Sequence, residues 1–192
     1  SRARTLAEGL KIPVQLRKSA FHPEENARRL NSIVLSYWLK PERSYLWVVT
    51  PKRVQLCTLP PQSEIDAAVD EYRKALLGPS QARDSAASEK LYQMLVAPAE
   101  KLIGTVEKDP RLLKAADVGH GKADVGHGKQ VPRVIVIADG SLVNLNFETL
   151  IVPTEQPHYW IEDATISNAS SIALLSAATH NGPMTRLHDR TM

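Results

Sequence analysis

The sequence contains little cysteine and no long apolar run. Its single cysteine, Cys57, excludes an internal disulfide and a thiolate-rich zinc site, and it fits a reducing compartment. The longest apolar runs, Tyr45–Val49 and Val134–Ala138, are five residues long, whereas a membrane-spanning helix needs roughly 20. We therefore expect no membrane partner and no signal peptide, and we favour the cytoplasm as the location.

Phosphate-binding glycine motifs and basic tracts are also missing. Neither G-x-x-x-x-G-K-[ST] nor G-x-G-x-x-G after a strand occurs, so nucleotide binding has no support. Residues 1–60 hold 11 of the 24 Lys/Arg against 4 of the 21 Asp/Glu, and the rest holds 13 against 17, which makes +7 followed by −4. Because the cations are scattered, they predict a solvated surface and no nucleic-acid partner.

The overall length and composition are those of one globular domain. The chain has 192 residues, of which 43% are hydrophobic and 23% charged. Segments 32–39, 45–50 and 53–59 are rich in β-branched and aromatic residues and predict an antiparallel meander. Alternation predicts one shared face within each of two segments, namely Ile33, Leu35, Tyr37 and Leu39 in the first and Tyr45, Trp47 and Val49 in the second.

Helical periodicity follows the meander. Ser63 and Asp66 resemble a capping box, and Pro98 divides a later helical run into two helices. Residues 133–138 are apolar on both faces, which is typical of a buried central strand, and a short strand is expected over 160–166. These segments together predict an α/β fold, with apolar helical positions at Ile65, Ala68, Val69, Tyr72, Leu76, Leu91, Met94, Leu95, Leu102 and Ile103.

Residues 108–130 lack any apolar period and are expected to form a loop that contains the sequence ADVGHGK twice. The repeat carries donors suited to zinc, nickel or copper, namely Asp117, His120, Asp124 and His127. Ordering so glycine-rich a loop would cost about 1–2 kcal/mol per residue. We favour a duplication in an unconstrained loop, and we predict neither a metal nor a cofactor.

Three further positions could carry chemistry. Cys57 could be a nucleophile, but its place inside a predicted strand favours a sheet residue. Asp139-Gly140 follows the central strand, where α/β sheets bind ligands, yet this pair is also a common turn. His180 lies near the end of the chain and is a weak catalytic candidate. The aromatic residues are expected to fill the core or a contact between modules, and they are Trp38, Tyr45 and Trp47.

Taken in order, several of these segments resemble the CHAT family, caspase-like domains commonly attached to tetratricopeptide repeats. Residues 1–6 resemble the end of the last repeat helix, and residues 35–39 and 44–50 resemble the opening strands of the family. Leu59-Pro60 precedes a predicted helix, as it does in the family, and residues 91–98 resemble the family's helix with its proline. Residues 134–150 resemble its central strand and the following loop, and Ile166 with Ser170-Ser171 resembles its next strand and helix start. The sequence departs from the family at Asn146, where proline is usual, and in the duplicated loop.

This resemblance implies a cysteine peptidase that uses a histidine base and a cysteine nucleophile. The family motifs for that pair, H-a-x-H-G/A and A-C-x-T, do not occur here, so neither His180 nor Cys57 receives a catalytic role. We expect residues 1–29 to be the end of a helical repeat with a linker. Residues 30–192 are then the amino-terminal part of a CHAT-like domain that is inactive alone, with catalytic residues unknown.

Two interpretations of function remain open, with a metal-binding loop protein as a third. The first is this partial peptidase domain, whose partners would be a peptide substrate and tetratricopeptide-type helices of the same chain. The second is a non-catalytic protein–protein interaction module, in which exposed aromatic residues of the meander contact a partner. An isolated half-domain should also leave the edge of strand 134–138 unpaired and prone to association.

Overall fold

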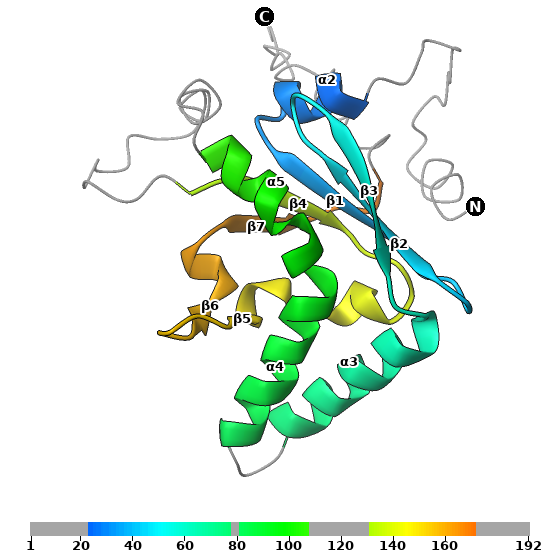
Figure 1. Ribbon diagram of the computed structural model, residues 1–192, viewed down its shortest axis with the longest axis vertical. Helices are drawn as coiled ribbons and strands as arrows, with labels where there is room; N and C mark the ends of the chain where they lie inside the picture. The colour runs from blue at the N-terminus through cyan, green and yellow to red at the C-terminus, as the bar shows by residue number, and fades with distance from the viewer. Residues whose placement is uncertain (1–22, 78–80, 108–130, 172–192) are drawn as a thin grey trace, which may run out of the picture.

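The computed structural model describes residues 23–77, 81–107 and 131–171, which form a mixed α/β unit (Figure 1). The first half contains α2 (Pro23–Arg29), β1 (Ile33–Trp38), β2 (Ser44–Val49), β3 (Val54–Leu59), α3 (Gln62–Leu76), α4 (Gln81–Leu95) and α5 (Ala97–Glu107). The second half contains β4 (Arg133–Ile137), β5 (Ile151–Val152), β6 (His158–Tyr159), β7 (Thr165–Asn168) and the 3-10 turns η2 (Gly140–Asn144), η3 (Phe147–Thr149) and η4 (Trp160–Glu162).

A five-stranded mixed sheet in the order β3-β2-β1-β4-β7 forms the middle of the fold. Strands β1, β2 and β3 pair antiparallel, which confirms the predicted meander. Strand β4 pairs in parallel with β1 on one side and with β7 on the other. The expected unpaired edge on residues 134–138 is therefore wrong, because Thr165–Asn168 supplies a strand beside β4.

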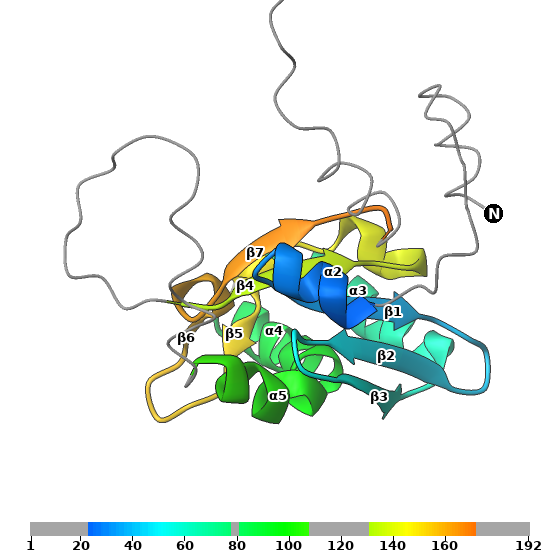
Figure 2. The ribbon, with the colours of Figure 1, turned by 90° about the horizontal axis from the view of Figure 1, so that it is seen from above.

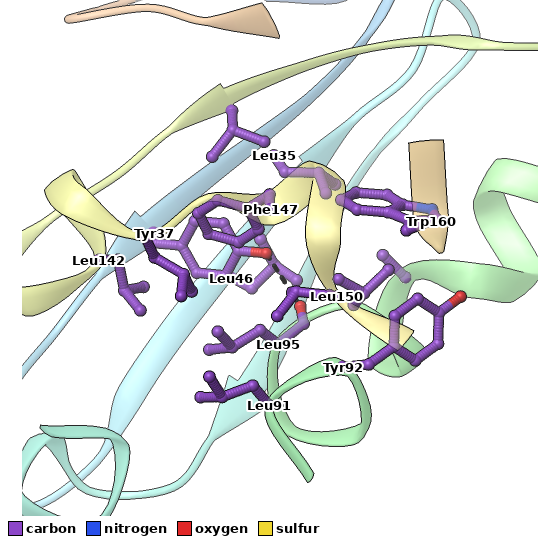
Figure 3. Close-up of a cluster of buried hydrophobic side chains, with 14 of the residues drawn as sticks. Leu35, Tyr37, Leu46, Leu91, Tyr92, Leu95, Leu142, Phe147, Leu150 and Trp160 are labelled. Carbon is purple, nitrogen blue, oxygen red and sulfur yellow. Dashed lines mark hydrogen bonds between the residues drawn. The ribbon is translucent and has the colours of Figure 1, made fainter. Parts of the chain in front are cut away.

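The main core lies between one face of the sheet, helices α3, α4 and α5, and the segment 142–164. Figure 3 shows its side chains from β1, β2, α4 and that segment. The predicted stripe of β1 is confirmed, since Ile33, Leu35, Tyr37 and Leu39 are all buried in it. The hydroxyl of Tyr37 donates to the carbonyl of Leu95 at 2.9 Å, which joins the sheet to the end of α4. Burial raises the pKa of Tyr37 far above its usual value, so this phenol stays protonated as a donor.

Helix α2 lies on the opposite face of the sheet (Figure 2). Its buried Ala27 packs against Val34, Val49 and Ile135, which point away from the main core. The expectation that residues 23–29 belong to a connecting stretch is wrong, because they form a helix. Proline at the first helical position, acidic residues in the first turn and arginines in the last turn stabilise this short helix.

Two boundaries differ from those predicted. Helix α3 begins at Gln62 after Pro61 without a side-chain cap, so Ser63 and Asp66 form no capping box. Residues 160–162 form a 3-10 turn, and the strand expected over 160–166 covers Thr165–Asn168. The two-helix prediction is confirmed, because α4 ends at Leu95 and α5 restarts at Ala97, just before Pro98.

Candidate functional site

Four large side chains project from the face of the meander that points away from the main core. They are Trp38 on β1, Tyr45 and Trp47 on β2, and Leu56 on β3, and we call them the aromatic face. The strand register places Trp38 beside Tyr45, and it places Trp47 between Ser36 and Leu56. Side chains at neighbouring positions on one side of a sheet contact each other, so these residues form one continuous surface.

Most of this surface is open to solvent. The exposed fractions are 50% for Trp38, 42% for Trp47 and 46% for Leu56, while Tyr45 is half-buried. The expectation that these aromatic residues fill the core is therefore wrong. On β2 the core positions are Leu46 and Val48, and alternation then turns Trp47 outward. The alternative expectation, a contact between modules, stays a prediction.

The aromatic face has defined internal contacts and a basic character. The rings of Trp38 and Tyr45 are tilted by 39° with centroids 6.1 Å apart. The ammonium of Lys40 lies 4.6 Å from the centroid of the Trp38 ring, within the range of a cation–π contact. The β1–β2 hairpin beside these rings carries Lys40 and Arg43 against Glu42, whereas Lys52 and Arg53 lie at the other end of the strands, in the β2–β3 turn beside α2.

Asp139 and Gly140 at the carboxyl end of β4 have a structural role. The carboxylate of Asp139 accepts a hydrogen bond from the backbone N–H of Leu39 at 3.0 Å, which ties the ends of β1 and β4 together. Gly140 has a φ of 56°, a conformation that glycine adopts without strain. A Cβ there would also come within 3.1 Å of the Leu39 side chain. The turn interpretation of this pair is confirmed.

Cys57 lies in β3 and is partly buried against the main core. Its thiol lies 3.5 Å from the carbonyl of Pro98 and 3.8 Å from the amide nitrogen of Gln55. The contact with Pro98 joins the edge of the sheet to α5, and the place of Cys57 within β3 agrees with the predicted role of a sheet residue. The other candidates, which are Asp117, His120, Asp124, His127 and His180, lie outside the described residues, as does the amino-terminal segment 1–22.

Sequence reasoning missed an ion pair that joins the start of β6 to the end of η4. The Nε2 atom of His158 lies 2.7 Å from a carboxylate oxygen of Asp163, and Nδ1 lies 3.0 Å from the carbonyl oxygen of Gln156. The pKa of His158 is raised, chiefly by the hydrogen bond to Asp163 and next by the bond to Gln156. Both ring nitrogens have a hydrogen-bond partner within residues 156–163, so the imidazole links the two sides of this turn. Only the nearby Pro157 could have indicated a turn here.

His158→Gln should reduce stability mainly at acidic pH. Because the folded pKa of His158 lies above its usual 6.5, its contribution is fully present below about pH 6.5 and is lost as the pH rises through the folded pKa. The side chains of His158 and Asp163 are 26% and 31% exposed, so we expect roughly 0.2–1 kcal/mol. Urea denaturation at pH 5.5 and 8.5 checks this, and an equal loss at both values would contradict it.

Comparisons with models of known families, with curated proteins and with solved structures found no match for this chain. Among the helices of the described ranges, none combines the length and apolar character needed to cross a membrane.

Proposed function

We propose that this chain is the amino-terminal part of a CHAT-like, caspase-type cysteine peptidase domain. In this proposal the chain contributes the meander and the first parallel strands, and it carries no catalytic pair itself. The observation that supports it is the sequential parallel order of β1, β4 and β7. A meander followed by helices and then by parallel strands is the order of elements that the resemblance implies.

The position of β7 makes such a continuation feasible. Among the described residues, β7 pairs only with β4, and its other side forms an edge of the sheet. Its Ile166 is buried in the main core, so a further parallel strand added there would extend the same hydrophobic layer. Ligands bind at the carboxyl ends of parallel strands in α/β sheets. A histidine and a cysteine at the ends of added strands would therefore lie along the edge where Asp139 holds β1 to β4.

Reading the coding sequence past the codon of Met192 tests the proposal. We expect an open frame that encodes one strand followed by a histidine and another followed by a cysteine. The longer chain should react with a cysteine-directed peptidase probe, and replacing the new cysteine with alanine should abolish the labelling. Cys57→Ser is the matched control and should retain labelling, because Cys57 lies within β3. A stop codon at that point, with no second chain that supplies the pair, would contradict the proposal.

A second candidate function is a non-catalytic protein–protein interaction module. The exposure of Trp38, Trp47 and Leu56 on one surface favours it. Aromatic residues dominate the binding energy of protein interfaces, and contiguous exposed apolar patches mark such sites. This function needs no catalytic pair, so it remains available if the peptidase proposal fails.

A further inference from the structure

We infer that the aromatic face binds an amphipathic helix whose apolar stripe is bordered by acidic residues. This inference rests on the interaction function proposed above and specifies the chemistry of the partner. Three observations carry it: the helix that already covers one end of the same sheet face, the aromatic residues left uncovered beside it, and the sign of the charge around them.

Helix α2 shows how this face of the sheet accepts a helix. It packs Ala27 on Val34, Val49 and Ile135, with Val54 and Ile137 partly buried at the same cluster. Its 7 residues span about 10 Å at 1.5 Å per residue, whereas the 6 residues of β1 or β2 span about 20 Å. Within the described residues, the part of this face that carries Trp38, Trp47 and Leu56 stays exposed. Figure 2 shows α2 lying over only part of β1 and β2.

The exposed part of this face carries the residues best suited to anchor a partner. Trp47 lies on the central strand of the meander, between Ser36 and Leu56, with Trp38 and Tyr45 next to it. Large aromatic side chains that become desolvated at the centre of an interface contribute most of its affinity. A helix laid beside α2 would cover them and would continue the layer that α2 begins.

The positive charge beside the aromatic face determines which kind of helix can bind there. At the uncovered end the β1–β2 hairpin carries +1, from Lys40 and Arg43 against Glu42, and the ammonium of Lys40 lies directly at the Trp38 ring. A second copy of the chain would present the same positive surface. Residues 1–22 also carry a positive charge, +4, from five cations and Glu8. Like charges across an interface oppose binding and opposite charges favour it, so a partner bordered by aspartate or glutamate is the complement.

Two synthetic helical peptides with the same apolar stripe, one bordered by glutamate and the other by lysine, test the inference on the full chain. By calorimetry, we expect the glutamate peptide to bind at least about tenfold more tightly at low salt, with the difference shrinking as salt is added. Its binding should also shift the tryptophan emission to shorter wavelength. That shift reports on Trp38 and Trp47, because Trp160 is already buried.

Paired variants locate the peptide. Trp47→Ser should weaken the glutamate peptide roughly 30-fold, whereas Ile161→Ser, which alters a side chain 50% exposed in η4, should leave the affinity unchanged. Lys40→Glu should weaken it several-fold, whereas Lys101→Glu, at an exposed position of α5, should not. Thermal melting confirms that each variant is folded.

The remaining outcomes would overturn the inference in distinguishable ways. Equal, Trp47-dependent affinity for both peptides would reject the acidic partner and leave the interaction function standing. If neither peptide binds, the chain is a monomer and deletion of residues 1–22 leaves the tryptophan emission unchanged, both the inference and the interaction function fail. If neither binds and sedimentation shows dimers that Trp47→Ser dissociates, the occupant is a second copy. If deleting residues 1–22 shifts the tryptophan emission to longer wavelength and creates peptide binding, that segment is the occupant.

Discussion

Trp160→Ala should lower the free energy of unfolding by about 3–5 kcal/mol. Trp160 is 2% exposed, and its ring meets that of Tyr92 edge-on with centroids 6.1 Å apart (Figure 3). Its backbone N–H donates to the carbonyl of Leu150 at 2.8 Å, so the side chain is held at a fixed depth. Truncation would leave a cavity between η4 and α4 that the surrounding helices cannot fill. Urea denaturation followed by far-ultraviolet circular dichroism measures the loss.

Ile161→Ala is the matched control for this prediction. Ile161 is the next residue in the same turn, and it is 50% exposed. We expect its truncation to change stability by less than about 0.5 kcal/mol, as is usual for surface positions. A loss below about 1 kcal/mol for Trp160→Ala would contradict the prediction, because it would mean that residues 150–164 pack loosely on the main core.

The elements predicted correctly from the sequence are those whose own apolar pattern indicates which residues are buried. The stripe of Ile33, Leu35 and Tyr37 and the apolar run of β4 indicate burial without knowledge of any neighbour. Helix α2 has one buried residue, Ala27, and β7 has one, Ile166, within Thr165–Asn168. A single buried residue creates no period, so these two elements depend on tertiary contacts that sequence patterns do not show.

The aromatic face illustrates a different limit of sequence reasoning. Alternation correctly places Tyr45, Trp47 and Val49 on one side of β2, but it does not tell which side meets the helices. The register with β1 decides this, because Leu46 and Val48 share the side of Tyr37 and Leu35. The His158–Asp163 pair was missed for a related reason, since it closes a turn across five residues and no regular period contains it.

The two faces of the sheet therefore differ in how they are covered. One face is closed by α3, α4 and α5 over a single large core, which stabilises the fold. On the other face, α2 covers one end within the described ranges, and Trp38 and Trp47 are exposed. Substitutions of buried residues in the first face should act on stability, whereas substitutions of exposed residues in the second should leave stability nearly unchanged and, under the proposed interaction function, should weaken binding.

Ser88→Ala should cost at least about 2 kcal/mol of stability, a large effect for the removal of one oxygen atom. The hydroxyl of Ser88 is buried in α4, where it donates to the carbonyl of Thr149 at 3.1 Å and accepts from the N–H of Ile151 at 2.9 Å. Alanine would remove both bonds at once, and each buried backbone group left without this partner costs roughly 1–3 kcal/mol.

Thr105→Ala provides the control for Ser88→Ala. The Thr105 hydroxyl also donates to a backbone carbonyl, that of Leu102 at 2.7 Å, but Thr105 is exposed. We expect Thr105→Ala to change stability by less than about 0.5 kcal/mol in the same urea denaturation. Equal effects of the two variants would contradict the bridging role of Ser88.

If Ser88→Ala and Trp160→Ala both destabilise as expected, the segment after β4 is held against α4 by packing and by hydrogen bonds. It would then hold β7 in place as the edge on which any further strand of this sheet would form.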